Sequence, residues 1–179
     1  MLININGIPK DGVTAKDIIL HLISKHGANG ANGHAIEFQG ETIDRMSIES
    51  RLTLCNMAVE FGAMTGIISP DKKTIEYISG KAFAPEKGDQ KLAEEYWASL
   101  KSDDGAHFSK VIDIDASKLN TYVTWGTSPE HAIEIKEKIP SIDQANSSKK
   151  NISIKKALDY MGLEENDAIR GTKIDAAFI

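Results

Sequence analysis

The sequence contains a single cysteine, Cys55, among its 179 residues. One thiol excludes an internal disulfide and is consistent with a reducing compartment, so we expect a cytoplasmic protein. The five histidines do not follow the spacing of a zinc-binding helix motif, and none has a cysteine nearby in the sequence. The sequence therefore predicts neither a disulfide scaffold nor a histidine-based metal site.

Positive charge and long apolar runs are also scarce. Lys and Arg number 21 against 26 Asp and Glu, which gives a net charge of −5 and argues against a nucleic-acid-binding face. No apolar run approaches the roughly 18 to 20 residues needed to cross a bilayer, and the first residues do not resemble a signal peptide. Hydrophobic residues at 41% and charged residues at 26% are typical of a folded globular chain.

Strand and helix patterns alternate over the first two thirds of the chain. The apolar–polar alternation of residues 2–6 and 111–115 predicts half-buried strands, the latter at a sheet edge. Residues 34–38 predict another strand, and residues 66–70 a short buried one. Four helices are expected here. The first is capped by Thr14 and ends at His26, and the others span residues 48–64, 73–79 and 90–100. Such alternation favours a layered α/β domain.

The pattern changes after about Leu119, where the predicted elements become shorter. Residues 141–151 are polar and predict a surface loop or linker, and a helix is expected at residues 152–161. The sequence then closes on the apolar, strand-like residues 176–179. Because termini are usually polar and loosely held, we expect this chain to be a segment of a larger protein.

A polar stripe on the helix expected at residues 48–64 is the main candidate for a functional site. Glu49, Thr53, Asn56 and Glu60 recur at helical spacing on a helix that is otherwise apolar almost all round. Asn56 and Glu60 are one turn apart, so their side chains can point at the same small object. The stripe is either the solvent face of a buried helix or one wall of a polar cleft, in which Asn56 donates to a substrate and Glu60 accepts from water or an imidazole.

Two further segments are distinctive. Residues 27–33 are rich in glycine, but no Gly-Lys-Ser/Thr follows and the loop leads into a strand, so a conformational need for glycine explains it better than phosphate binding. Trp125 is either a packed loop anchor or the neighbour of a ligand site lined by Thr127 and Ser128. Cys55 is expected to act as a small hydrophobe within its helix.

Several motifs resemble one known family. Residues 51–63, Arg-Leu-Thr-Leu-Cys-Asn-Met-Ala-Val-Glu-Phe-Gly-Ala, resemble the helix motif of the aconitase family. Other segments are similar to the isopropylmalate dehydratase branch of this family and follow in the same order: residues 12–18, 33–40, 66–71, 80–85, 123–129 and 157–163. The resemblance covers nearly the whole chain.

This resemblance implies a three-layer α/β/α middle domain over residues 1–118 and, over residues 119–179, a segment leading back to a cluster domain. Members of the family bind a [4Fe–4S] cluster through three cysteines and use its open iron as a Lewis acid. The resemblance also implies a small-subunit partner and, as reaction, the isomerisation of 2-isopropylmalate to 3-isopropylmalate in leucine biosynthesis. Because the cluster cysteines are missing here, we expect the isolated chain to bind no cluster and to be inactive.

Two residues carry over from the family's active site. Asn56 matches a position that holds substrate, and Glu60 matches one that positions water or hydroxyl at the open iron. Cys55 matches a helix cysteine that is not a cluster ligand. Two alternatives stay open: a homoaconitase-type hydro-lyase with another 2-hydroxy acid as substrate, and a non-catalytic binding module of the same fold.

Overall fold

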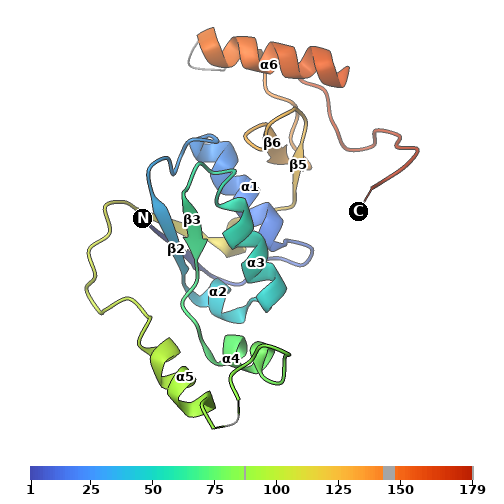
Figure 1. Ribbon diagram of the computed structural model, residues 1–179. Coiled ribbons are helices and arrows are strands. Elements are labelled where there is room, and N and C mark those ends of the chain that lie inside the picture. Colours follow the sequence, from blue (N-terminus) through green and yellow to red (C-terminus); the bar gives the residue numbers. More distant parts are fainter. Residues whose placement is uncertain (87, 143–147, 179) are drawn as a thin grey trace.

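A four-stranded parallel sheet forms the centre of the molecule in the computed structural model, which describes residues 1–86, 88–142 and 148–178 (Figure 1). The strand order is β3-β2-β1-β4. The strands are β1 (Leu2–Asn6), β2 (Ala35–Gln39), β3 (Thr65–Ile67) and β4 (Val111–Asp115). In the register, Ile3 lies beside Phe38 and Ile112, and Ile5 lies beside Ile114, so these side chains share one face. The expected edge position of residues 111–115 is confirmed.

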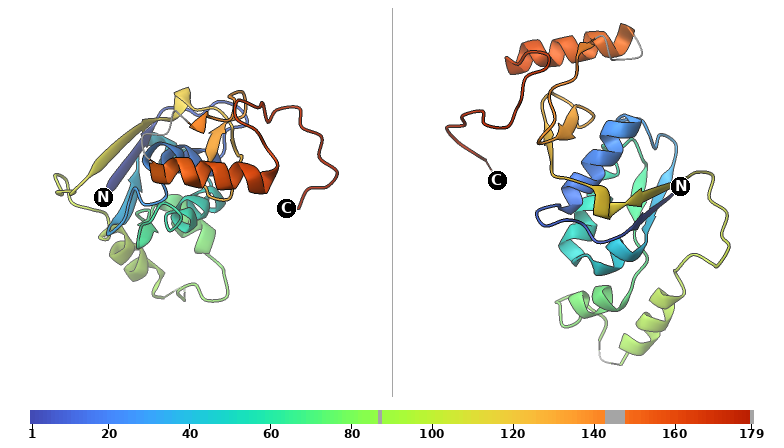
Figure 2. Two further views of the ribbon diagram at one scale, coloured as in Figure 1. Left: turned by 90° about the horizontal axis from the view of Figure 1, so that it is seen from above. Right: turned by 180° about the vertical axis from the view of Figure 1, so that it is seen from behind.

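Two helices cover this apolar face, namely α1 (Ala15–His26) and α3 (Ile48–Met57), with the short α2 (Glu41–Arg45) packing against β1 and β2 (Figures 1 and 2). Helix α1 begins after Thr14, whose backbone N–H and hydroxyl both donate to the Asp17 carboxylate at 2.7 Å. It ends at Gly27, whose φ of 81° favours glycine. The structure is therefore an α/β domain with a parallel sheet flanked by helices, as the pattern predicted.

The connection from β3 to β4 contains α4 (Lys72–Ile78) and α5 (Gln90–Ala98), close to the two helices expected there. Neither helix has a buried residue. Beyond α5 the chain returns over the face of the sheet opposite α1, where the Ser102 hydroxyl donates to the Glu37 carboxylate at 2.6 Å. The two helices thus lie apart from the sheet, at one end of the molecule (Figure 1).

The chain after Leu119 builds a second, smaller apolar cluster. The 3-10 helix η1 (Ala116–Lys118) leads to an antiparallel pair of strands, β5 (Tyr122–Thr124) and β6 (Ala132–Glu134), and then to α6 (Ser148–Met161). The buried members of this cluster are Trp125, Ile133, Ile139, Ala157 and Leu158. Tyr122 fastens the strand pair to α1, because its N–H donates to Asp17 at 2.7 Å and its hydroxyl lies 2.8 Å from His21 Nδ1.

Three expectations in the second half of the chain need correction or fall outside the description. Helix α6 begins at Ser148, so residues 148–151 are helical and not linker, while residues 143–147 lie outside the described residues. Residues 176–178 are exposed and form no strand, since no described strand lies beside them to complete a ladder. Among the described helices, none is both long and apolar enough to cross a membrane.

Candidate active site

Helix α3 is fixed at its amino-terminal half by a buried arginine. The side chain of Arg51 is 5% exposed; its Nε donates to the Ile43 carbonyl at 3.1 Å and its Nη2 pairs with Asp71 at 2.6 Å. The hydrogen bond from Arg51 is the main reason that the pKa of Asp71 falls to about 2. Sequence reasoning missed this pair, although Arg51 precedes the buried Leu54 by three residues and so shares its inward face.

The carboxyl-terminal end of α3 differs from the expected helix over residues 48–64. Regular helix ends at Met57, and the chain then closes in a Schellman motif: Ala63 N–H donates to the Ala58 carbonyl at 3.0 Å and Gly62 N–H to the Val59 carbonyl at 2.8 Å. Gly62 adopts a φ of 90°, which is incompatible with a right-handed helix, so the helix cannot extend past this residue. In the sequence, the apolar residues after Met57 look like a continuation of the helix. In the structure they form a turn that places Phe61 in the core.

Asn56 and Glu60 are both exposed, the first in the last turn of α3 and the second in the Schellman motif. Glu49 is exposed on the same helix, and the Thr53 hydroxyl donates to the Glu49 carbonyl at 3.0 Å. The stripe therefore faces outward, and Asn56 and Glu60 are open to a ligand or to another part of a larger protein.

The surroundings of the stripe are more exposed than the sequence suggested. Three large apolar side chains near the stripe are exposed as well: Leu52 at 49%, Val59 at 62% and Met64 at 78%. The helix is thus not buried all round. Strand β3, expected to be buried, is at the sheet edge, and its Ile67 is 51% exposed. An exposed apolar surface beside a polar pair is typical of a face that another chain segment or ligand covers.

Cys55 lies beside this stripe but has the properties of an inert thiol. It is half-buried, and burial raises the pKa of its thiol. The described residues contain no cluster of three or more histidine, cysteine or acidic side chains placed to hold a metal ion. An iron–sulfur cluster needs several thiolates, and this sequence offers one. The residues of this chain therefore do not fit the ligand set of the [4Fe–4S] cluster that the resemblance implies.

The segment around Trp125 forms a packed loop. Trp125 is 3% exposed and stacks on His131, with ring centroids 4.7 Å apart. Burial lowers the pKa of His131, and its Nδ1 has no partner among the described residues. Thr127 is exposed at the tip, and the Ser128 hydroxyl accepts from the Glu130 N–H at 3.4 Å. Trp125 thus serves as the anchor of this loop.

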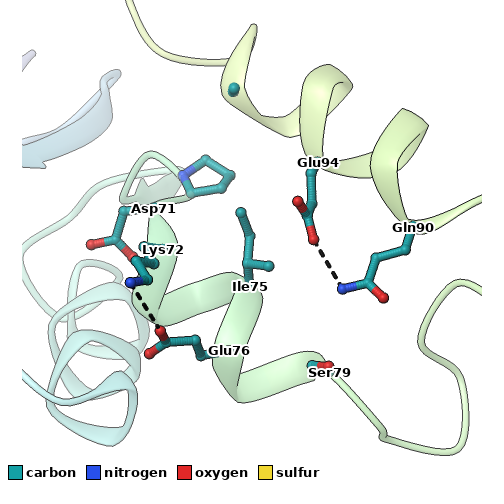
Figure 3. A pocket seen from close by; sticks show the side chains of 9 residues that line it. Asp71, Lys72, Ile75, Glu76, Ser79, Gln90 and Glu94 are labelled. Carbon is teal, nitrogen blue, oxygen red and sulfur yellow. Dashed lines mark hydrogen bonds and ion pairs between the residues drawn. The ribbon is translucent and has the colours of Figure 1, made fainter. Parts of the chain in front are cut away.

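A hollow of about 450 Å³ lies between α4 and α5 (Figure 3). Most of its charged and amide side chains already have partners: Asp71 pairs with Arg51 of α3, and two further pairs form within α4 and α5. Gln90 donates to Glu94 at 2.9 Å, and Lys72 lies 3.7 Å from Glu76. Because these groups satisfy each other and do not converge on a common point, the hollow lacks the arrangement of a catalytic site.

Comparison with known proteins identifies the family. Residues 1–179 match the family described as "Aconitase family (aconitate hydratase)". The chain is 46% identical over all 179 residues to the "3-isopropylmalate dehydratase large subunit" of Campylobacter jejuni subsp. jejuni serotype O:6 and to that of serotype O:23/36. It spans 38% of the length of each of these relatives. The match covers both apolar clusters and the helices between them, and the chain belongs to the aconitase family.

Proposed function

We propose that this chain is part of the large subunit of a dehydratase that isomerises 2-isopropylmalate to 3-isopropylmalate, a step of leucine biosynthesis. The reaction removes water from one pair of carbons and adds it back in the opposite orientation. The observation that carries the proposal is the 46% identity to dehydratase large subunits along the entire chain. The exposed polar and apolar face around Asn56 supports it, because a cleft wall needs that combination.

Asn56 and Glu60 are the residues that we assign to the substrate wall. The Asn56 amide can donate a hydrogen bond to a substrate carboxylate or hydroxyl. The Glu60 carboxylate can accept from the water or hydroxyl group that leaves and returns, and so hold it over the carbon that it attacks. Their placement around the end of one helix keeps the two roles within one small region.

The [4Fe–4S] cluster would belong to other parts of the same subunit. Family enzymes use a cluster, and the one thiol of this chain cannot bind it. We accordingly propose residues 1–118 as the middle domain and residues 119–179 as the segment that leads to the cluster-binding part. A small subunit would complete the site over the exposed face of α3. The isolated chain would then be inactive.

The test compares the isolated chain with the longer subunit that contains it, each mixed with the small subunit after anaerobic reconstitution with iron and sulfide. We expect 3-isopropylmalate to form only with the longer subunit. The isolated chain should show no cluster absorption band. A stoichiometric cluster on residues 1–179 would contradict the assignment.

The choice of substrate decides between the two dehydratase interpretations. Turnover of homocitrate with none of 2-isopropylmalate would replace the proposed substrate by that of a homoaconitase. A longer subunit that binds a cluster and turns over neither acid would favour a non-catalytic module.

A further inference from the structure

The glycine-rich loop at residues 27–33 contacts the Schellman motif that carries Glu60. We propose that this loop, and Gly30 in particular, positions the Glu60 carboxylate for the reaction. The inference rests on the proposed function, because it assigns Gly30 a role only through Glu60. The two segments are about thirty residues apart in the sequence and meet at the end of α3.

Gly30 lies directly against the ring of Phe61, the residue after Glu60. A Cβ added to Gly30 would overlap this ring, with 2.7 Å to Cζ, and would lie 2.9 Å from the His26 Cβ. Phe61 is fully buried, so its ring has no free space into which to retreat. Glycine at this position therefore follows from the close approach of two segments, and φ at Gly30 is not in the left-handed region.

Backbone contacts join the loop to the same turn. The Ala31 N–H donates to the Phe61 carbonyl at 3.0 Å. A Cβ on Gly62 would lie 2.9 Å from the Ala28 carbonyl oxygen, so the turn also approaches the loop from its other end. Glu60 is thus one residue from a hydrogen bond and a ring contact that both originate in the loop.

The loop itself is held by two distant elements. The Lys110 ammonium group, next to β4, donates to the Gly30 carbonyl at 3.0 Å. The Ala28 N–H donates to the Glu130 carboxylate at 3.3 Å, in the segment after β5. The sheet and the segment before the second apolar cluster both restrain the loop. The loop can therefore restrain the Schellman motif that carries Glu60. A shift of about 1 Å in a catalytic group can lower a rate by up to a hundredfold.

The experiment measures kcat and KM of the full-length subunit with its small subunit and cluster. Gly30→Ala should lower kcat at least tenfold and leave KM for 2-isopropylmalate within twofold. In a Glu60→Gln background the same substitution should change kcat by less than twofold, because the group that it displaces is already gone. The loss of thermal stability caused by Gly30→Ala should be the same in both backgrounds.

A compensating substitution gives the decisive control. Phe61→Leu removes the ring that the added methyl group of Gly30→Ala would strike, so it should restore part of the kcat that Gly30→Ala loses. Phe38→Leu shortens another fully buried phenylalanine of the same core and should restore nothing. Gly88→Ala, in the connection between α4 and α5, places a Cβ where no atom lies within 4 Å and where φ is not left-handed, and should leave kcat within twofold.

Three outcomes overturn the inference. These are a kcat of Gly30→Ala within twofold of wild type, an equal fold-loss in both backgrounds, or equal recovery with Phe38→Leu. A Glu60→Gln subunit with wild-type kcat would instead refute the proposed role of Glu60, and with it the need to position that residue. If Gly30→Ala does not fold, Lys110→Met removes the bond to the Gly30 carbonyl and leaves the glycine itself in place. The kcat of Lys110→Met should fall about threefold in the otherwise wild-type subunit. In the Glu60→Gln background, Lys110→Met should leave kcat unchanged.

Discussion

Helix α1, which packs on the sheet, and helix α5, which lies apart from it, are both amphipathic, yet they differ completely in burial. Helix α1 buries seven of its residues, while α4 and α5 bury none. Leu92 and Tyr96 of α5 are 69% and 63% exposed. An amphipathic pattern thus predicts that a helix forms, but not what covers its apolar side.

The two exposed helices depend on local interactions. Lys72 pairs with Glu76 in α4, and Lys91 lies 3.8 Å from Glu95 in α5. Exposed pairs of this spacing contribute only about 0.3 to 0.5 kcal/mol each. In a larger subunit, a neighbouring segment over Leu92 and Tyr96 would supply the apolar contacts that these helices lack.

The largest effect on stability should come from truncation in the sheet core. Phe38→Ala removes from β2 a ring that is 1% exposed in the main apolar core, and should lower the free energy of unfolding by about 3 to 5 kcal/mol. Leu92→Ala in α5 should change it by less than about 0.5 kcal/mol. Urea denaturation of the isolated chain measures both. Equal losses would show that α5 packs as tightly as the sheet.

A second truncation tests whether the two apolar clusters unfold separately. Leu158→Ala removes a side chain that is 5% exposed in α6 and should destabilise its cluster by about 2 to 3 kcal/mol. Hydrogen exchange should then speed up at the amides of α6 and leave those of β1 and α1 unchanged. Faster exchange throughout the sheet would mean that the clusters form one cooperative unit.

The pair of Arg51 and Asp71 should give a smaller, pH-dependent effect. The pKa of Asp71 in the folded chain, about 2, lies below its ordinary value of 3.8, so the pair stabilises the fold above about pH 4 and is lost as the pH falls towards 2. The Asp71 side chain is 37% exposed, and solvent screening reduces the contribution to about 1 kcal/mol. Asp71→Asn, which can still cap α4, should be less stable than wild type at pH 7, and the difference should shrink steadily as the pH falls from about 4 through 2. A constant difference across this range would exclude the ion pair as its cause.

Local patterns predicted most of the fold, since strand alternation and helix periodicity depend on near neighbours. They failed where distant contacts decide. The helix after Ile48 ends at Met57 because Phe61 inserts into the core and Gly62 turns the chain. The glycine at position 62 is a local stop signal, but the burial of Phe61 has no local signature in an apolar run. The burial of Arg51 depends on Asp71, twenty residues away. The candidate site was found as a stripe, but its roles came from family resemblance, because spacing alone does not distinguish a cleft wall from a solvent face.

The most direct test of the account is the kcat of Glu60→Gln in the full-length subunit with its small subunit, compared with Glu49→Gln. Both substitutions remove one exposed carboxylate from the same stripe, and Glu49 lies at the far end of α3. We predict that Glu60→Gln lowers kcat by about a hundredfold or more, as for a positioned acid–base group, and that Glu49→Gln stays within twofold of wild type. A kcat of Glu60→Gln within twofold of wild type would contradict this role of Glu60 and would show that the stripe is an ordinary solvent-exposed face.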